Sequence, residues 1–117
     1  MSNITKQNKK TRVSYFLPEA ILLDVKEMMM KERYDLKGKS KWVSEAIHDL
    51  LSFQNLNELV MINDQMEGLV KLDSISIEFE LKKKLDATVI EIRKEYPSIE
   101  GVQSKILRTA IVQRLLR

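Results

Sequence analysis

Two short stretches of the chain follow a two-residue alternation of polar and apolar positions. In residues 12–17 and in residues 74–79, one face of each stretch is apolar throughout. The apolar positions are Val13, Tyr15 and Leu17 in the first stretch and Ile75, Ile77 and Phe79 in the second. A period of two is typical of a strand with one buried face. The pattern therefore predicts two β-strands whose equivalent positions lie 62 residues apart.

A helix is expected after each strand. The first covers residues 19–33 and follows Pro18, a residue type tolerated in the first turn of a helix. The second covers residues 81–95 and ends before Pro97, because proline disfavours helical geometry in the residue that precedes it. The 62-residue offset superposes apolar positions of the two helices: Leu23 on Leu85, Val25 on Ala87, Met28 on Ile90, Met30 on Ile92, and Tyr34 on Tyr96.

A second helix follows in each half of the chain. Ser40 is the expected N-cap of a helix over residues 41–51, and Ser104 is the expected N-cap of a helix over residues 105–116. The offset between these helices is 64, so the second interhelical loop is two residues longer. Apolar residues between 53 and 60 can extend the helix that ends at residue 51.

Strand, helix and helix are thus repeated in tandem. We expect a flexible basic arm over residues 1–10, a first unit over 11–62, a linker over 63–71 and a second unit over 72–117. A lone six-residue strand leaves its backbone groups unpaired, so the two strands should pair with each other. The predicted fold class is mainly α, with an intramolecular two-stranded antiparallel β-ribbon and four helices that form one core.

The outward face of this ribbon carries the candidate functional residues. They are Arg12, Ser14 and Phe16 from the first strand and Ser74, Ser76 and Glu78 from the second. A two-stranded ribbon fits the major groove of double-stranded DNA, where side chains reach distinct patterns of base edges. Double-stranded DNA is therefore the expected partner.

Residues 12–19, Arg-Val-Ser-Tyr-Phe-Leu-Pro-Glu, are followed by a helix, a Gly-x-Ser turn and a second helix. This arrangement resembles the ribbon-helix-helix superfamily of Arc- and MetJ-type regulators, and the resemblance covers residues 12–52 and 73–117. It implies a tandem ribbon-helix-helix protein whose six outward strand residues contact bases. It also implies that the second helices hold backbone phosphates at their N-termini, where free N–H groups and the helix dipole attract anions. The implied phosphate contacts are Lys39, Ser40, Lys41, Ser104 and Lys105, and Lys10 at the end of the basic arm is expected to join them.

The chain departs from that family at two outward positions. Phe16 and Glu78 stand where family members often carry a basic residue. Phe16 can pack on a thymine methyl group and Glu78 can accept a hydrogen bond from cytosine N4. Alternatively, Glu78 repels the DNA backbone and leaves the second strand a weak reader. Because the two halves differ, an asymmetric DNA site is expected rather than a palindrome.

Charge and composition permit this function without demanding it. The 117-residue chain has 44% hydrophobic residues and a net charge of +3, spread evenly along its length. It contains no cysteine, one histidine (His48), no phosphate-cradling glycine-rich loop and no metal-ligand pattern, so neither an enzyme nor a cofactor or metal is expected. No apolar run approaches the roughly 18 residues of a membrane span, and residues 1–10 lack a signal-peptide core, which favours a cytoplasmic protein without a membrane partner.

Three functions remain open at this point. The first is a transcriptional regulator that binds operator DNA, as a single copy, as a homodimer or as copies side by side. The second is a relaxosome accessory protein of a conjugative or other mobile element, similar to single-chain tandem proteins of the TraY type. The third is a helical adaptor that binds protein and has no affinity for DNA.

Overall fold

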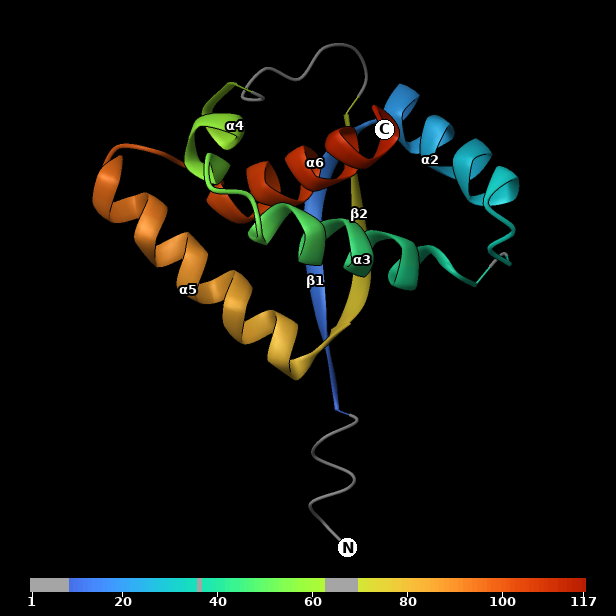
Figure 1. The fold of residues 1–117 in the computed structure, drawn as a ribbon, viewed down its shortest axis with the longest axis horizontal. Helices are drawn as coiled ribbons and strands as arrows, with labels where there is room; N and C mark the ends of the chain where they lie inside the picture. The colour runs from blue at the N-terminus through green and yellow to red at the C-terminus, as the bar shows by residue number, and fades with distance from the viewer. Residues whose placement is uncertain (1–8, 36, 63–69) are drawn as a thin grey trace, which may run out of the picture.

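The computed structural model describes residues 9–35, 37–62 and 70–117. The fold in this part of the chain is mainly helical, with one two-stranded antiparallel sheet and five helices (Figure 1). In chain order the elements are β1 (Lys10–Pro18), α2 (Glu19–Lys31), α3 (Lys39–Leu51), α4 (Leu56–Ile62), β2 (Val70–Glu78), α5 (Phe79–Glu95) and α6 (Val102–Leu115). Most of the expected arm and linker, residues 1–8 and 63–69, lies outside the described residues.

The antiparallel pairing of the two predicted strands is confirmed. Val13 lies opposite Ile75, so the pairing brings together the same two positions that the 62-residue offset relates. A twofold rotation about an axis through this pair exchanges the two strands, as expected if the two halves of the chain are equivalent. Both strands extend further than the alternation predicted, to Lys10 at one end and to Val70 at the other.

The helices in the described part of the chain cover one face of the ribbon. Figure 1 shows α3 and α6 crossing in front of β1 and β2, with α5 and α2 on opposite sides of this pair. The ribbon residues beneath them are almost completely buried: Val13, Tyr15, Leu17, Ile75 and Ile77 are each at most 2% exposed. The alternating pattern therefore corresponds to one apolar face under the helices and one face that none of the described helices covers.

The two halves of the chain exchange their packing partners. Helix α3, from the first half, packs against β2, while α6, from the second half, packs against β1. The helices α3 and α6 also pack against each other, and their buried side chains, which include Trp42, Ile47 and Ile106, belong to one core cluster. Since each second helix buries its apolar side chains on the strand of the other half, the core belongs to both halves together.

The prediction of four helices is wrong for the described residues, because α4 is a separate fifth helix. Helix α3 ends at Leu51, and the hydroxyl of Ser52 donates to the carbonyl oxygen of Asp49 at 2.6 Å. The chain then turns before α4, whose Leu56 and Val60 are buried in the core. Of the apolar residues after position 52, Leu56, Leu59 and Val60 therefore belong to a new helix instead of an extension, while Phe53 lies between the two helices.

The predicted N-caps are also wrong. Helix α3 begins at Lys39 after Gly38, and α6 begins at Val102 after Gly101, so Ser40 and Ser104 lie inside the first turns. Gly101 has a φ of 62°, a left-handed conformation that glycine adopts without steric cost. The two serine hydroxyls have other partners, described below.

The first helices of the two halves align differently from the prediction. The buried side chains are Val25 and Met29 in α2 and Leu85, Thr88 and Ile92 in α5. Their spacing corresponds to an offset of 63, which leaves Leu23, Met30 and Ile90 exposed. Phe79, expected on the inner face of the second strand, instead begins α5 and is 46% exposed.

Substitutions on the two faces of β2 should have very different effects on stability. We expect Ile75→Ala to lower the free energy of unfolding by about 3 kcal/mol, because it leaves a cavity in the core. Leu72→Ala, on the exposed face of the same strand, should change it by less than about 0.5 kcal/mol. Urea unfolding followed by circular dichroism measures both values. Similar losses in the two variants would contradict a ribbon with a single buried face.

Candidate nucleic-acid interface

All six predicted base-contact residues lie on the helix-free face of the ribbon. Four cross-strand pairs make up this face: Lys10 with Glu78, Arg12 with Ser76, Ser14 with Ser74, and Phe16 with Leu72. Ser74 and Ser76 are half-buried and the other side chains are exposed. The structure thus gathers the predicted residues into one strip, two side chains wide.

Leu72 is part of this face and was missed by the sequence reasoning. It is 64% exposed and lies directly opposite Phe16. The signal was present, because Leu72 continues the two-residue spacing of Ser74 and Ser76. It was hidden by Asp73, a charged residue at an inward position of the strand, which made the apolar alternation start two residues later.

The N-terminus of α6 is bound to the outer edge of β1. The backbone N–H of Phe16 donates to Ser104 Oγ at 3.1 Å, and Gln103 Nε2 donates to the carbonyl oxygen of Ser14 at 3.0 Å. These two bonds use strand groups that have no partner within a two-stranded sheet. Gln103 is a positioning residue that the sequence reasoning did not single out.

The N-terminus of α3 is bound in the same manner to the outer edge of β2. The backbone N–H of Ser76 donates to Ser40 Oγ at 3.1 Å. The hydroxyls of Ser40 and Ser104 therefore do not cap their helices; each joins its helix to a strand of the ribbon. Each hydroxyl accepts from a strand and retains its own proton, which it can donate to a phosphate oxygen. The free N–H groups of the first helical turns lie beside the same two edges.

Lys39 does not present a free charge, because it is paired with Asp73. Its Nζ lies 2.7 Å from Asp73 Oδ1, and the hydroxyl of Tyr15 donates to the other carboxylate oxygen at 2.8 Å. Burial opposes ionisation of Asp73, but the hydrogen bonds from Lys39, Tyr15 and the Ser74 N–H together hold its pKa below the usual value. This group explains how a carboxylate is accommodated at an inward strand position. It also makes Lys39 a weaker candidate for a phosphate contact than its neighbour Lys41.

A groove of about 600 Å³ runs between the ribbon, the side of α3 and the first two turns of α5. Five predicted contact residues line it together: Lys10, Ser40, Lys41, Ser76 and Glu78. Glu45, Glu80 and Lys84 also line the groove, so its positive and negative charges are balanced. Lys105, the remaining predicted phosphate contact, is half-buried in the first turn of α6, on the other edge of the ribbon.

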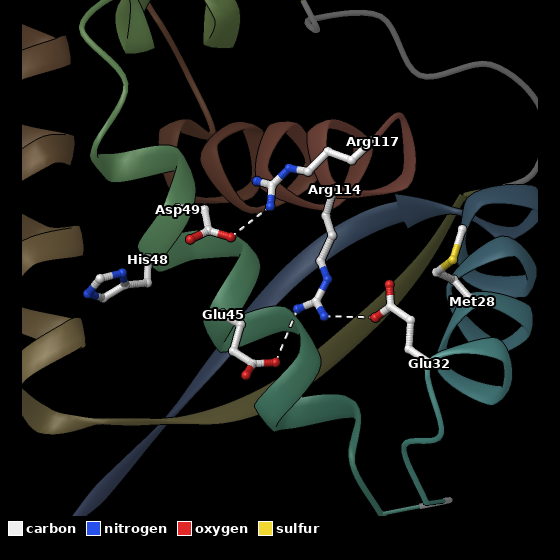
Figure 2. A pocket seen from close by; sticks show the side chains of 7 residues that line it. All are labelled: Met28, Glu32, Glu45, His48, Asp49, Arg114 and Arg117. Atoms are coloured by element: carbon white, nitrogen blue, oxygen red, sulfur yellow. Dashed lines mark hydrogen bonds and ion pairs between the residues drawn. The ribbon is translucent and has the colours of Figure 1, made fainter.

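A second depression, of about 430 Å³, is lined by charged side chains that bind one another. Figure 2 shows Arg114 of α6 reaching between Glu45 of α3 and Glu32 at the end of α2. Its Nη2 lies 2.8 Å from Glu32 Oε2 and its Nη1 lies 3.2 Å from Glu45 Oε1. Arg114 also donates to the carbonyl oxygen of Trp42 and lies 4.4 Å from the centre of the Trp42 ring. These contacts join α6 to α3 and to the end of α2. Because Arg114 is paired with acidic side chains of the protein, no ligand is needed to explain why charged residues gather here.

No group of three or more His, Cys, Asp or Glu side chains in residues 9–35, 37–62 and 70–117 could hold a metal ion. Among the helices placed by the structure, none has the length and apolar character required to cross a membrane.

Comparisons with protein-family models, with characterised proteins and with solved structures give no match. The geometry of the ribbon and its flanking helices is therefore the basis for proposing a function.

The Arg114 contacts should contribute measurably to stability. Arg114→Ala removes a largely buried cation and leaves Glu32 and Glu45 without it, so we expect a loss of about 2 kcal/mol in the free energy of unfolding. Arg117→Ala is the matched control, because Arg117 makes an exposed ion pair with Asp49 that is worth less than about 0.5 kcal/mol. Equal losses in urea unfolding of the two variants would contradict this assignment.

Proposed function

We propose that this protein binds double-stranded DNA in a sequence-specific manner and inserts the β1–β2 ribbon into the major groove. The observation that carries the proposal is the helix-free face of the ribbon, with an arginine and three serines in its middle. Helix N-termini flank this face on both edges. The major groove is about 12 Å wide and admits a two-stranded ribbon of this kind.

The side chains of the face have suitable chemistry for reading bases. Arg12 is exposed and can donate two hydrogen bonds to guanine O6 and N7. Ser14, Ser74 and Ser76 can each donate or accept a hydrogen bond at a base edge. The first turns of α3 and α6 can hold the phosphates on either side of the groove, with Ser40, Lys41, Ser104 and Lys105 as contacts.

We further propose that the fold is a tandem ribbon-helix-helix, with β1, α2 and α3 as one unit and β2, α5 and α6 as the other. The pairing of Val13 with Ile75 and the exchanged packing of α3 on β2 and α6 on β1 both support two equivalent, interlocked units. Helix α4 lies between the units and has no counterpart in the second one among the described residues.

Within DNA binding, the proposed role is transcriptional regulation, and a relaxosome accessory role in a mobile element is the alternative. Both roles need the same ribbon, so they differ in the DNA site and in the neighbouring genes. Selection of bound sequences from a random pool, followed by footprinting on genomic DNA, identifies the site. A site in a promoter supports the regulator, whereas a site beside a relaxase gene supports the alternative. A protein-binding adaptor would select no sequence.

Removal of the base-contacting groups should reduce sequence-specific binding without unfolding the protein. We expect Arg12→Ala to weaken binding to the selected site about 10- to 100-fold and Ser14→Ala to weaken it less, with little change on unrelated DNA. Lys94→Ala is the control for loss of one positive charge, because Lys94 is exposed near the end of α5, away from the ribbon. Fluorescence anisotropy measures the affinities. Equal losses for Arg12→Ala and Lys94→Ala would contradict base reading by the ribbon.

Loss of a phosphate contact should affect all DNA sequences alike. Lys41→Ala removes an exposed cation from the first turn of α3, so binding should weaken uniformly on specific and unrelated DNA. The slope of log affinity against log salt concentration should become less steep by about one unit. A titration between low and moderate salt measures this slope. An unchanged slope would show that Lys41 contacts no phosphate.

A further inference from the structure

The two ends of the helix-free face differ in their chemistry. At one end Lys10 lies opposite Glu78, and at the other end Phe16 lies opposite Leu72. The 62-residue offset makes Leu72 the equivalent of Lys10 and Glu78 the equivalent of Phe16. Positions related by the axis through Val13 and Ile75 therefore carry a charged pair at one end and an apolar pair at the other.

The apolar pair forms a continuous surface. The N–H of Phe16 is bonded to Ser104 Oγ, at the outer edge, so Phe16 and Leu72 are a pair without backbone hydrogen bonds to each other. Cα atoms in such pairs are only about 4.5 Å apart, which brings their side chains close together. Both side chains remain substantially exposed, Phe16 at 49% and Leu72 at 64%, so neither is used by the core.

We infer that the Phe16–Leu72 pair packs on thymine methyl groups and gives the protein a fixed orientation on an asymmetric DNA site. This inference rests on the proposed function. The C5-methyl of thymine is the apolar group that base pairs display in the major groove, and an aliphatic and an aromatic side chain together provide a matching contact surface.

The surroundings of the pair favour DNA over an apolar protein surface as the occupant. The first turn of α6 is bound directly beside Phe16, and it contains Lys105 and has no acidic residue. A ligand that covers the apolar pair is therefore brought close to a helix N-terminus that attracts anions. DNA offers a methyl group and a phosphate in neighbouring positions, whereas an apolar protein surface would cover the helix N-terminus without a negative charge.

The register also predicts where the thymines lie. Phe16 is four residues from Arg12 along β1, which corresponds to about 13 Å at the rise of a strand. A strand in the major groove runs obliquely to the DNA axis, so this length spans at most about four base steps of 3.4 Å. The preferred site should therefore have thymine at one end only, no more than about four base pairs from the base read by Arg12.

Replacement of single thymines by uracil tests this inference, because it removes the methyl group and leaves the hydrogen-bonding pattern unchanged. The DNA is the sequence selected by the full chain, with uracil introduced at one position at a time. We expect the wild-type protein to lose about fourfold in affinity for each methyl group that it covers. The losses should be confined to one end of the site.

The variants Phe16→Ser and Leu72→Ser connect this effect to the pair. Each should bind the thymine site more weakly than the wild type and show a smaller further loss on the uracil site than the wild type does. Leu23→Ser is the matched control, since Leu23 is an exposed leucine on α2, and it should keep the full wild-type response. Unfolding midpoints close to that of the wild type verify that the variants are folded.

The possible failures are distinguishable. If sequence-specific binding is retained but no thymine-to-uracil replacement weakens it, the inference is overturned and the proposed function stands. If Phe16→Ser and Leu72→Ser abolish self-association of the free protein and leave the uracil response unchanged, the pair is a contact between copies and the inference is also overturned. If the full chain selects no DNA sequence, the proposed function itself fails.

Discussion

The pairing of β1 with β2 is the contact on which the rest of the structure depends. A two-stranded sheet leaves an outer row of N–H and C=O groups on each strand, and such edges need partners. Here Ser40 accepts from β2, whereas Ser104 and Gln103 bind β1. The bonds that complete the sheet therefore also fix the first turns of α3 and α6 beside it. A change in strand register by one residue would turn the apolar face outward and displace both helices.

The strands and their pairing could be predicted because each follows a two-residue period and neither is stable alone. Features that depend on a specific tertiary contact could not be predicted. Asp73 interrupts the pattern at an inward position, and only the structure shows that Lys39 and Tyr15 bind its carboxylate. Ser40 and Ser104 resemble N-caps in sequence, but their hydroxyls bind strand amides instead. The alternation of positions along each strand was enough to place the six predicted base-contact residues on one face. Leu72 was missed because the second strand was predicted to begin at residue 74, whereas it begins at Val70.

Each half of the chain contains a strand followed by two long helices, but the two halves have different side chains at equivalent positions. Arg114 joins α6 to α3 and to the end of α2, and the 64-residue offset places the buried Leu50 at its equivalent position. No second copy of this contact can therefore exist at the related place. The same divergence appears on the helix-free face, where a charged pair and an apolar pair occupy equivalent positions. In a symmetric homodimer each substitution would occur twice, so such a dimer cannot have a polarised face, whereas a single chain that carries both halves can.

Carrying both strands in one chain also changes how ribbon formation depends on concentration. When two separate molecules supply the strands, the ribbon exists only above the concentration at which they associate, and folding and association are then inseparable. In this chain the second strand is always present at the high effective concentration that a covalent linker provides. Because α3 packs on β2 and α6 on β1, residues of both halves are needed to complete the core under the ribbon. A single chain supplies both halves, so the affinity for any ligand on the exposed face need not include the cost of bringing two chains together.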